Sequence, residues 1–464
     1  MVKQEQNEPR RGPKTLEPFL RHGNAVAVIL LVIVAVGFGL RLDRVVNPHP
    51  VPGDDALVYR ALAESLYEDG SYGGPDFRDP SDWSPGAPLL FAAGHFAVGE
   101  VNDGVGRGIQ ALLGTAAILV VFLIAARLDP GPTAPLLAAG LVALYPPFIH
   151  SVGSLMSEPA AIFMLPAAVL AFLWADSVGG RAAPVAWILP GLLFGLTSLI
   201  RPEYLFASVV MVLFLLIRQW FRSGPPKALL AAASFSIALL VPIVPWTIHN
   251  LVTLERVVPI TTGSGKALFV GTYLPADGEY EAVKADLLER FEGVSLPVGS
   301  EELDEVDPAP LFDRVAAQYP ELDRDEALGR IGRENLSRYL REEPLDYFGM
   351  LVRKGTRMWS SGVGEAMSSP PGRAVQLYLV LAGLAGALLL GAARRWEVIP
   401  LTIPIIVISA IGVLTLAPPR RNEVLMTLVL VLGATAISAG RRWLVGSGGS
   451  LLPDTPRPDG GSAS

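Results

Sequence analysis

About ten apolar segments run along the chain, each close to the roughly 20 residues that a helix needs to cross a bilayer. Because no water inside a bilayer can satisfy a free backbone group, such segments cross it as helices. The fold expected from the sequence is therefore an all-α polytopic membrane protein. The segments fall near residues 24–41, 106–126, 132–149, 157–175, 184–200, 203–219, 228–248, 374–393, 397–416 and 422–439.

The composition supports this class and excludes others. Charged residues make up 17% of the chain, against about 25% in ordinary soluble proteins. The absence of cysteine excludes disulfides, thiolate nucleophiles and cysteine metal sites. The formal charge of −7 argues against a nucleic-acid partner.

Basic residues predict the topology, because they gather in cytoplasmic connections. If the spans cross the membrane in alternating directions, Arg127, Arg222 and the pairs Arg394-Arg395 and Arg441-Arg442 all fall on the same side of it. Both termini are then cytoplasmic, in a cell (inner or plasma) membrane. The run from Asn24 to Leu40 is expected to stay as an anchor, since no small-residue cleavage site follows it.

Two connections on the predicted outer side are too long to be turns. In the first, residues 55–68 have helical spacing with Leu57, Leu62 and Leu66 on one face, and residues 88–98 suit an interfacial helix. In the second, residues 324–340 and 345–359 are amphipathic. The predicted domains are a disordered cytoplasmic tail (1–23), a catalytic bundle (24–250) that includes the first outer loop (42–105), an extracytoplasmic soluble segment (251–371), C-terminal membrane helices (372–440) and a disordered cytoplasmic tail (441–464).

An acidic pair, Asp54-Asp55, stands at the start of the first loop helix. One aspartate suffices to cap a helix, which is worth about 1 kcal/mol. The second is then a free carboxylate near the membrane and a candidate general base. Glu158 opens the fourth span at the same predicted face. Either the positive end of the helix dipole stabilises its carboxylate there, or Glu158 lines the same site as the acidic pair.

Three arginines on the predicted outer side run against the usual distribution of charge: Arg201, Arg420 and Arg421. Guanidinium groups bind phosphate oxygens through two parallel hydrogen bonds, so a phosphate ligand would explain them. The alternative is ion pairing, of Arg201 with Glu203 and of Arg421 with Glu423.

Lys266 ends a Thr-Thr-Gly-Ser-Gly-Lys stretch that lacks the spacing of a nucleotide-binding loop, but it is a candidate contact for a lipid phosphate. His249 ends a span and either lines the site or sits at the interface. The histidines show no metal-ligand spacing, whereas Asp54, Asp55 and Glu158 offer the oxygen ligands that a divalent cation takes. No cofactor is certain from the sequence, and metal dependence stays open.

Four segments in this order resemble the GT-C superfamily of membrane glycosyltransferases, in particular the family 39 type with the protein O-mannosyltransferases and the aminoarabinose transferase. Tyr59 follows the acidic pair as in the family's first-loop motif. The four segments are GDDALVYRALAESLYEDGSYG, WSPGAPLLFAAGHFAVG, GLLFGLTSLIRPEYL, and VPIVPWTIHN followed by VVPITTGSGKALFVGTY.

The resemblance implies an inverting transfer of a hexose or pentose from a polyprenyl-phosphate donor to an acceptor hydroxyl on the extracytoplasmic face. The acceptor would be a protein, a polysaccharide or a glycolipid. Asp54, Asp55 and Glu158 would be catalytic, and the substrate-binding residues would be Tyr59, Arg201, His249, Lys266, Arg420 and Arg421. The alternative is a transporter or lipid flippase, which usually shows related halves.

Overall fold

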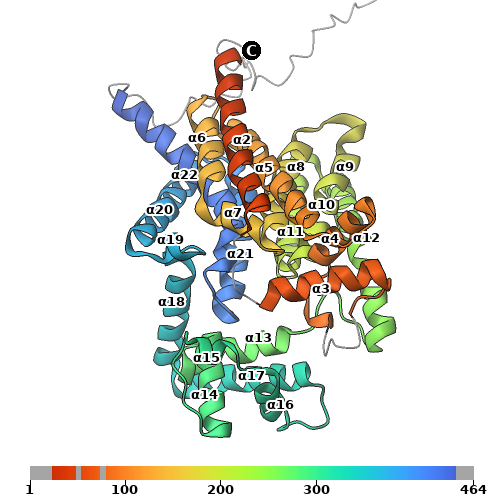
Figure 1. Ribbon diagram of the computed structural model, residues 1–464. Helices are drawn as coiled ribbons and strands as arrows, with labels where there is room; N and C mark the ends of the chain where they lie inside the picture. The colour runs from red at the N-terminus through yellow and green to blue at the C-terminus, as the bar shows by residue number, and fades with distance from the viewer. Residues whose placement is uncertain (1–22, 49–53, 74–79, 446–464) are drawn as a thin grey trace, which may run out of the picture.

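The computed structural model describes residues 23–48, 54–73 and 80–445, with only the backbone of residues 54 and 181. The two predicted tails lie outside the described residues, except for residue 23 of the first and residues 441–445 of the second. The described residues form helices and connecting turns without a strand, so the expected all-α fold is confirmed. Figure 1 shows two layers: a bundle of long apolar helices, and a group of polar helices at one end of it.

The apolar bundle corresponds to the expected spans. Within the described part of the chain, eight helices are long and apolar enough to cross a membrane, or nine if one bent pair counts as a span. The remaining helix, Val398–Leu414, has 17 residues and is shorter. The bundle comprises α2 (Gly23–Val46), α5 (Asp103–Leu128), α6 (Thr133–Leu144), α7 (Pro146–His150), α8 (Glu158–Ser177), α9 (Ala183–Ala186), α10 (Ile188–Ile200), α11 (Tyr204–Ser223), α12 (Pro225–Leu254), α20 (Pro370–Ala392), α21 (Val398–Leu414) and α22 (Arg420–Val445).

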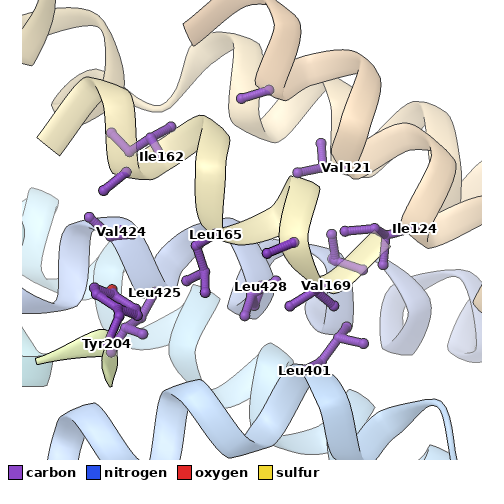
Figure 2. Packing of buried hydrophobic residues seen from close by; sticks show 14 of the residues in the cluster. Val121, Ile124, Ile162, Leu165, Val169, Tyr204, Leu401, Val424, Leu425 and Leu428 are labelled. Carbon is purple, nitrogen blue, oxygen red and sulfur yellow. The ribbon is translucent and has the colours of Figure 1, made fainter. Parts of the chain in front are cut away.

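Helix α22 is the centre of this bundle. Of its most apolar window, 83% is buried. Leu425 and Leu428 of α22 face Leu165 of α8 and Leu401 of α21 (Figure 2). Helix α20 approaches α22 closely at Gly386, where a Cβ atom would lie 1.9 Å from the carbonyl oxygen of Leu432. Such small-residue contacts let helix backbones pack together in a membrane, where burial of apolar surface drives association less.

The expected third span, residues 132–149, is not one straight helix. It bends by 53° between α6 and α7, at Pro146 and Pro147, which have no N–H to donate to the carbonyls of Val142 and Ala143. Arg41 of α2 supplies the missing donors: its Nη2 lies 3.0 Å from the Val142 oxygen and its Nη1 lies 3.2 Å from the Ala143 oxygen. A fully buried arginine thus repairs the backbone of a broken span.

The polar segment, residues 264–360, has a hydrophobic core of its own. This core joins Phe269, Leu287, Phe312 and Leu328, which come from four helices. At Gly265 a Cβ atom would lie 1.8 Å from the carbonyl oxygen of Asp325, so α13 and α17 cross in close contact. The helices are α13 (Ser264–Gly271), α14 (Tyr280–Glu292), α15 (Glu301–Asp304), α16 (Ala309–Ala316), α17 (Arg324–Glu342) and α18 (Pro344–Ser360), and the short α19 (Glu365–Ser368) leads back to the bundle.

Between α2 and α5 lies the first loop, with α3 (Asp54–Glu68), the 3-10 turn η1 (Pro80–Asp82) and α4 (Gly86–Val98). Both helices were expected. The buried face of α3 includes Leu62, as expected, together with Tyr59 and Ala63, but the expected burial of Leu57 is wrong, since it is 67% exposed. The reason is that α3 packs on α4 along the line of Tyr59 and Ala63, which turns Leu57 outward.

Candidate active site

Helix α3 brings an aspartate and a tyrosine to one end of the bundle. Asp55 and Tyr59 are four residues apart and so share a face of α3. The Ser84 hydroxyl donates to the Ile200 carbonyl at 2.7 Å, so the Tyr59 hydroxyl, 3.4 Å from Ser84 Oγ, is the donor of that pair. This chain of contacts fixes α3 beside the end of α10, one residue before Arg201.

Glu158 and Arg201 form the buried centre of the site. Glu158 is the first residue of α8 and is 3% exposed. Arg201 follows α10, and its Nη1 lies 2.8 Å from Glu158 Oε1 while its Nε lies 3.1 Å from Glu203 Oε1. The guanidinium therefore joins the start of α8 to the turn between α10 and α11.

The charges on this turn stabilise one another. Burial raises the pKa of Glu203, but the positive charges of Arg201 and then Arg421 bring it down to about 2. Burial lowers the pKa of Arg201, but the carboxylates of Glu203 and Glu158 hold it well above the ordinary value. The ion pair between Arg201 and Glu203, which the sequence offered as an alternative to phosphate binding, is present.

The N-terminus of α22 supplies the other two arginines. Arg420 Nη1 binds the carboxylate of Asp55, and the Arg421 Nη1 donates to Thr415 Oγ1 at 3.3 Å. The following residue, Asn422, donates to the Ser361 carbonyl at 2.9 Å and so fixes this end of α22 to the end of α18. Arg420 also interacts electrostatically with Glu158, so α3, α8 and α22 contribute to one charged cluster.

Tyr59 lies within this cluster as a neutral phenol. Its side chain is 7% exposed. Burial raises its pKa, and the negative charges of Glu158 and Asp55 add to this effect. A tyrosine that stays protonated keeps its O–H available as a hydrogen-bond donor.

Two expected substrate-binding residues make contacts elsewhere. Lys266 Nζ lies 3.8 Å from Asp82 Oδ2, at the contact between the first loop and the polar segment. The His249 ring lies against Trp246, with 4.7 Å between ring centroids, and 6.4 Å from Tyr72. The structure therefore joins Asp55, Tyr59, Glu158, Arg201, Arg420 and Arg421 in one cluster, and places Lys266 and His249 in other contacts.

Glu423 belongs to this end of the bundle in a way that sequence reasoning missed. It was considered only as an ion-pair partner of Arg421, but among the described contacts no such pair occurs. It is 2% exposed, and the negative charge of Glu158 acts on its carboxylate. The signal in the sequence was a carboxylate in the first turn of a strongly apolar helix, since an intramembrane acidic residue is a candidate for function.

The described carboxylates do not form a cation site as they stand. Arg420 holds Asp55 and Arg201 holds Glu158. Among the residues whose side chains are described, no three acidic or histidine groups are arranged to hold a metal ion. Asp54 opens α3 next to Asp55, but its side chain is outside the described part.

Comparison with known proteins shows what this chain is similar to. Residues 82–246 match the family model described as dolichyl-phosphate-mannose-protein mannosyltransferase. No curated protein matches the sequence. The fold is similar to that of the oligosaccharyltransferase AglB from Archaeoglobus fulgidus, solved with an inhibitory peptide and a dolichol-phosphate, at a TM-score of 0.53 and 14% identity over 92% of this chain and 51% of that one. An oligosaccharyltransferase from Archaeoglobus fulgidus in the apo form gives a TM-score of 0.53 and 16% identity over 92% and 52% of the two chains.

A second solved structure is ArnT from Cupriavidus metallidurans bound to undecaprenyl phosphate, with a TM-score of 0.42 and 16% identity over 90% of this chain and 79% of that one. The chain spans about half the length of AglB. Its fold is similar to that of AglB, and its residues 82–246 match the mannosyltransferase family model, in agreement with the resemblance of its motifs to the GT-C superfamily.

Proposed function

We propose that this protein is a membrane glycosyltransferase that moves a sugar from a polyprenyl-phosphate donor to an acceptor hydroxyl at the extracytoplasmic face, with inversion. The cluster of Arg201, Arg420 and Arg421 with acidic groups, at the end of the bundle next to the polar segment, carries this proposal. The described ends of the chain, near Gly23 and Val445, lie at the opposite end (Figure 1), as two cytoplasmic termini would require.

In the reaction, Asp54 accepts the proton of the acceptor hydroxyl. The hydroxyl oxygen forms a bond to the anomeric carbon as the bond from that carbon to the phosphate oxygen breaks. A positioned base of this kind contributes about 10²–10⁴-fold. The leaving group is a polyprenyl phosphate, whose charge the arginines at the start of α22 stabilise.

The acceptor approaches from the side of the polar segment. Residues 264–360 contact the first loop through Asp82 and the bundle through α18. This segment lies at the same end of the bundle as α3 (Figure 1), so we expect it to select the acceptor.

The test is the affinity for polyprenyl phosphate of purified protein in lipid. We expect Arg420→Ala to weaken binding about ten-fold or more, because a hydrogen bond to a charged group is worth about 1.5–3 kcal/mol. Arg441→Ala is the matched control: Arg441 lies near the other end of α22 and bonds Thr133. Equal affinities for wild type and Arg420→Ala would contradict the phosphate site.

A further inference from the structure

The three arginines of the site differ in what they are free to bind. The Arg201 side chain is 10% exposed and holds two carboxylates. Arg421 is partly buried and donates to Thr415. The Arg420 side chain is 45% exposed and is held by Asp55. Arg420 is therefore the arginine that an incoming phosphate reaches most easily.

The partner of Arg420 is itself one of the two acidic residues at the start of α3. The Asp55 side chain is 22% exposed and that of Arg420 is exposed, so solvent reaches this ion pair mainly from the side of Arg420. Exposed pairs of this kind are weak, because water and salt compete with them. A phosphodiester anion that binds Arg420 would sit next to the Asp55 carboxylate and be repelled by it.

We propose that Asp55 is the resting counter-ion of Arg420 and gives up this guanidinium to the donor phosphate, so that Asp55 sets donor affinity while Asp54 accepts the proton. The inference rests on the function proposed above and assigns different roles to the two aspartates. Asp55 is a positioning residue: it holds Arg420 in place before the donor arrives. After transfer, departure of the polyprenyl phosphate lets Asp55 return to Arg420.

The variant Asp55→Asn removes the competing charge and nearly keeps the shape of the side chain. We expect its dissociation constant for polyprenyl phosphate to fall about two- to five-fold, as the loss of a weak exposed ion pair implies. The donor KM should fall with it, while kcat stays within about ten-fold of wild type. In contrast, Asp54→Asn should lower kcat by about 10²–10⁴-fold and leave the dissociation constant nearly unchanged.

The chain offers a matched control in a second exposed pair on α3. Arg60 Nε lies 2.9 Å from Asp103 Oδ1, with side-chain exposures of 46% and 30%. The variant Asp103→Asn also removes one carboxylate from an arginine of similar exposure, but away from the charged cluster. It should leave donor affinity and turnover unchanged, which separates competition at Arg420 from a general change in charge.

Two results would overturn the inference. One is an Asp55→Asn variant that binds polyprenyl phosphate no more tightly than wild type. The other is an Asp55→Asn variant whose kcat falls by 100-fold or more, which would make Asp55 the base. Either result, obtained with active wild type, leaves the proposed function standing. A wild-type protein that releases no polyprenyl phosphate from any donor and binds none would overturn both.

Discussion

Lys354 on α18 shows how a single buried charge joins the polar segment to the bundle. Its side chain is fully buried, and Nζ donates to the carbonyls of Gly271 at 2.7 Å and Thr415 at 2.6 Å. Burial, with the charges of Arg357 and Arg421, lowers its pKa from 10.5 to about 7, and Asp277 opposes this effect. A neutral amine has two N–H groups, one for each carbonyl.

This pKa predicts a stability that depends on pH. Between about pH 7 and 10.5 the unfolded chain protonates Lys354 and the folded protein does not, so the contribution of this residue to stability rises with pH in that window and is lost as pH falls toward 7. Thermal unfolding of wild type and Lys354→Met, compared from pH 7 to 9.5, should show a difference that shifts in favour of wild type as pH increases. A difference independent of pH would mean that Lys354 is charged in the fold.

At the scale of single elements, the broken span formed by α6 and α7 depends on one side chain from α2. Replacing Arg41 with methionine would leave the carbonyls of Val142 and Ala143 without their donors. An unsatisfied buried acceptor costs about 1–3 kcal/mol, so we expect a clear loss of thermal stability. The measurement is the unfolding temperature in detergent.

The compensating change tests the cause. Adding Pro146→Ala and Pro147→Ala to Arg41→Met restores two backbone N–H groups, which can donate to the carbonyls of Val142 and Ala143. The triple variant should then recover part of the lost stability. If it is no more stable than Arg41→Met alone, the effect of Arg41 lies in its packing and not in these hydrogen bonds.

The elements differ in how well the sequence predicts them. Helices such as α5 and α22 are long apolar runs, and their length and composition are enough to predict them from the sequence. The break at Pro146 carried a local signal, two consecutive prolines, that the expected span passed over. The Arg41 side chain that satisfies the freed carbonyls could not be predicted, because it lies about a hundred positions away in the sequence. For the same reason the sequence suggested Arg201 and Arg420 as phosphate ligands but could not show that Glu158 and Asp55 hold them. Partners this far apart in sequence are set by tertiary packing.

At the scale of the whole molecule, Asp82 ties the first loop to the polar segment. It accepts a hydrogen bond from Thr262 and lies 3.8 Å from Lys266 Nζ and 3.4 Å from Arg324 Nη2. The Thr262 N–H also donates to the Ser81 carbonyl at 2.9 Å. These contacts hold the polar segment beside the loop that carries the acidic pair.

We therefore expect Asp82→Ala to loosen this contact without unfolding either part. Hydrogen exchange should become faster in η1 and in α13, and stay unchanged in α5 and α8. Glu321→Gln, which removes an exposed partner of Arg330 within the polar segment, is the control. Unchanged exchange in η1 and α13 of the Asp82→Ala variant would show that other contacts hold the two parts together.

Turnover is the direct test of the proposed sugar transfer from a polyprenyl-phosphate donor. The measurement is release of polyprenyl phosphate by purified protein in lipid, over a panel of donor sugars and acceptors, for wild type and Asp54→Asn. We expect acceptor-dependent release that Asp54→Asn lowers by about 10²–10⁴-fold. Release that Asp54→Asn leaves unchanged would contradict the assignment of the base, and movement of the donor between leaflets without any release would identify a transporter instead.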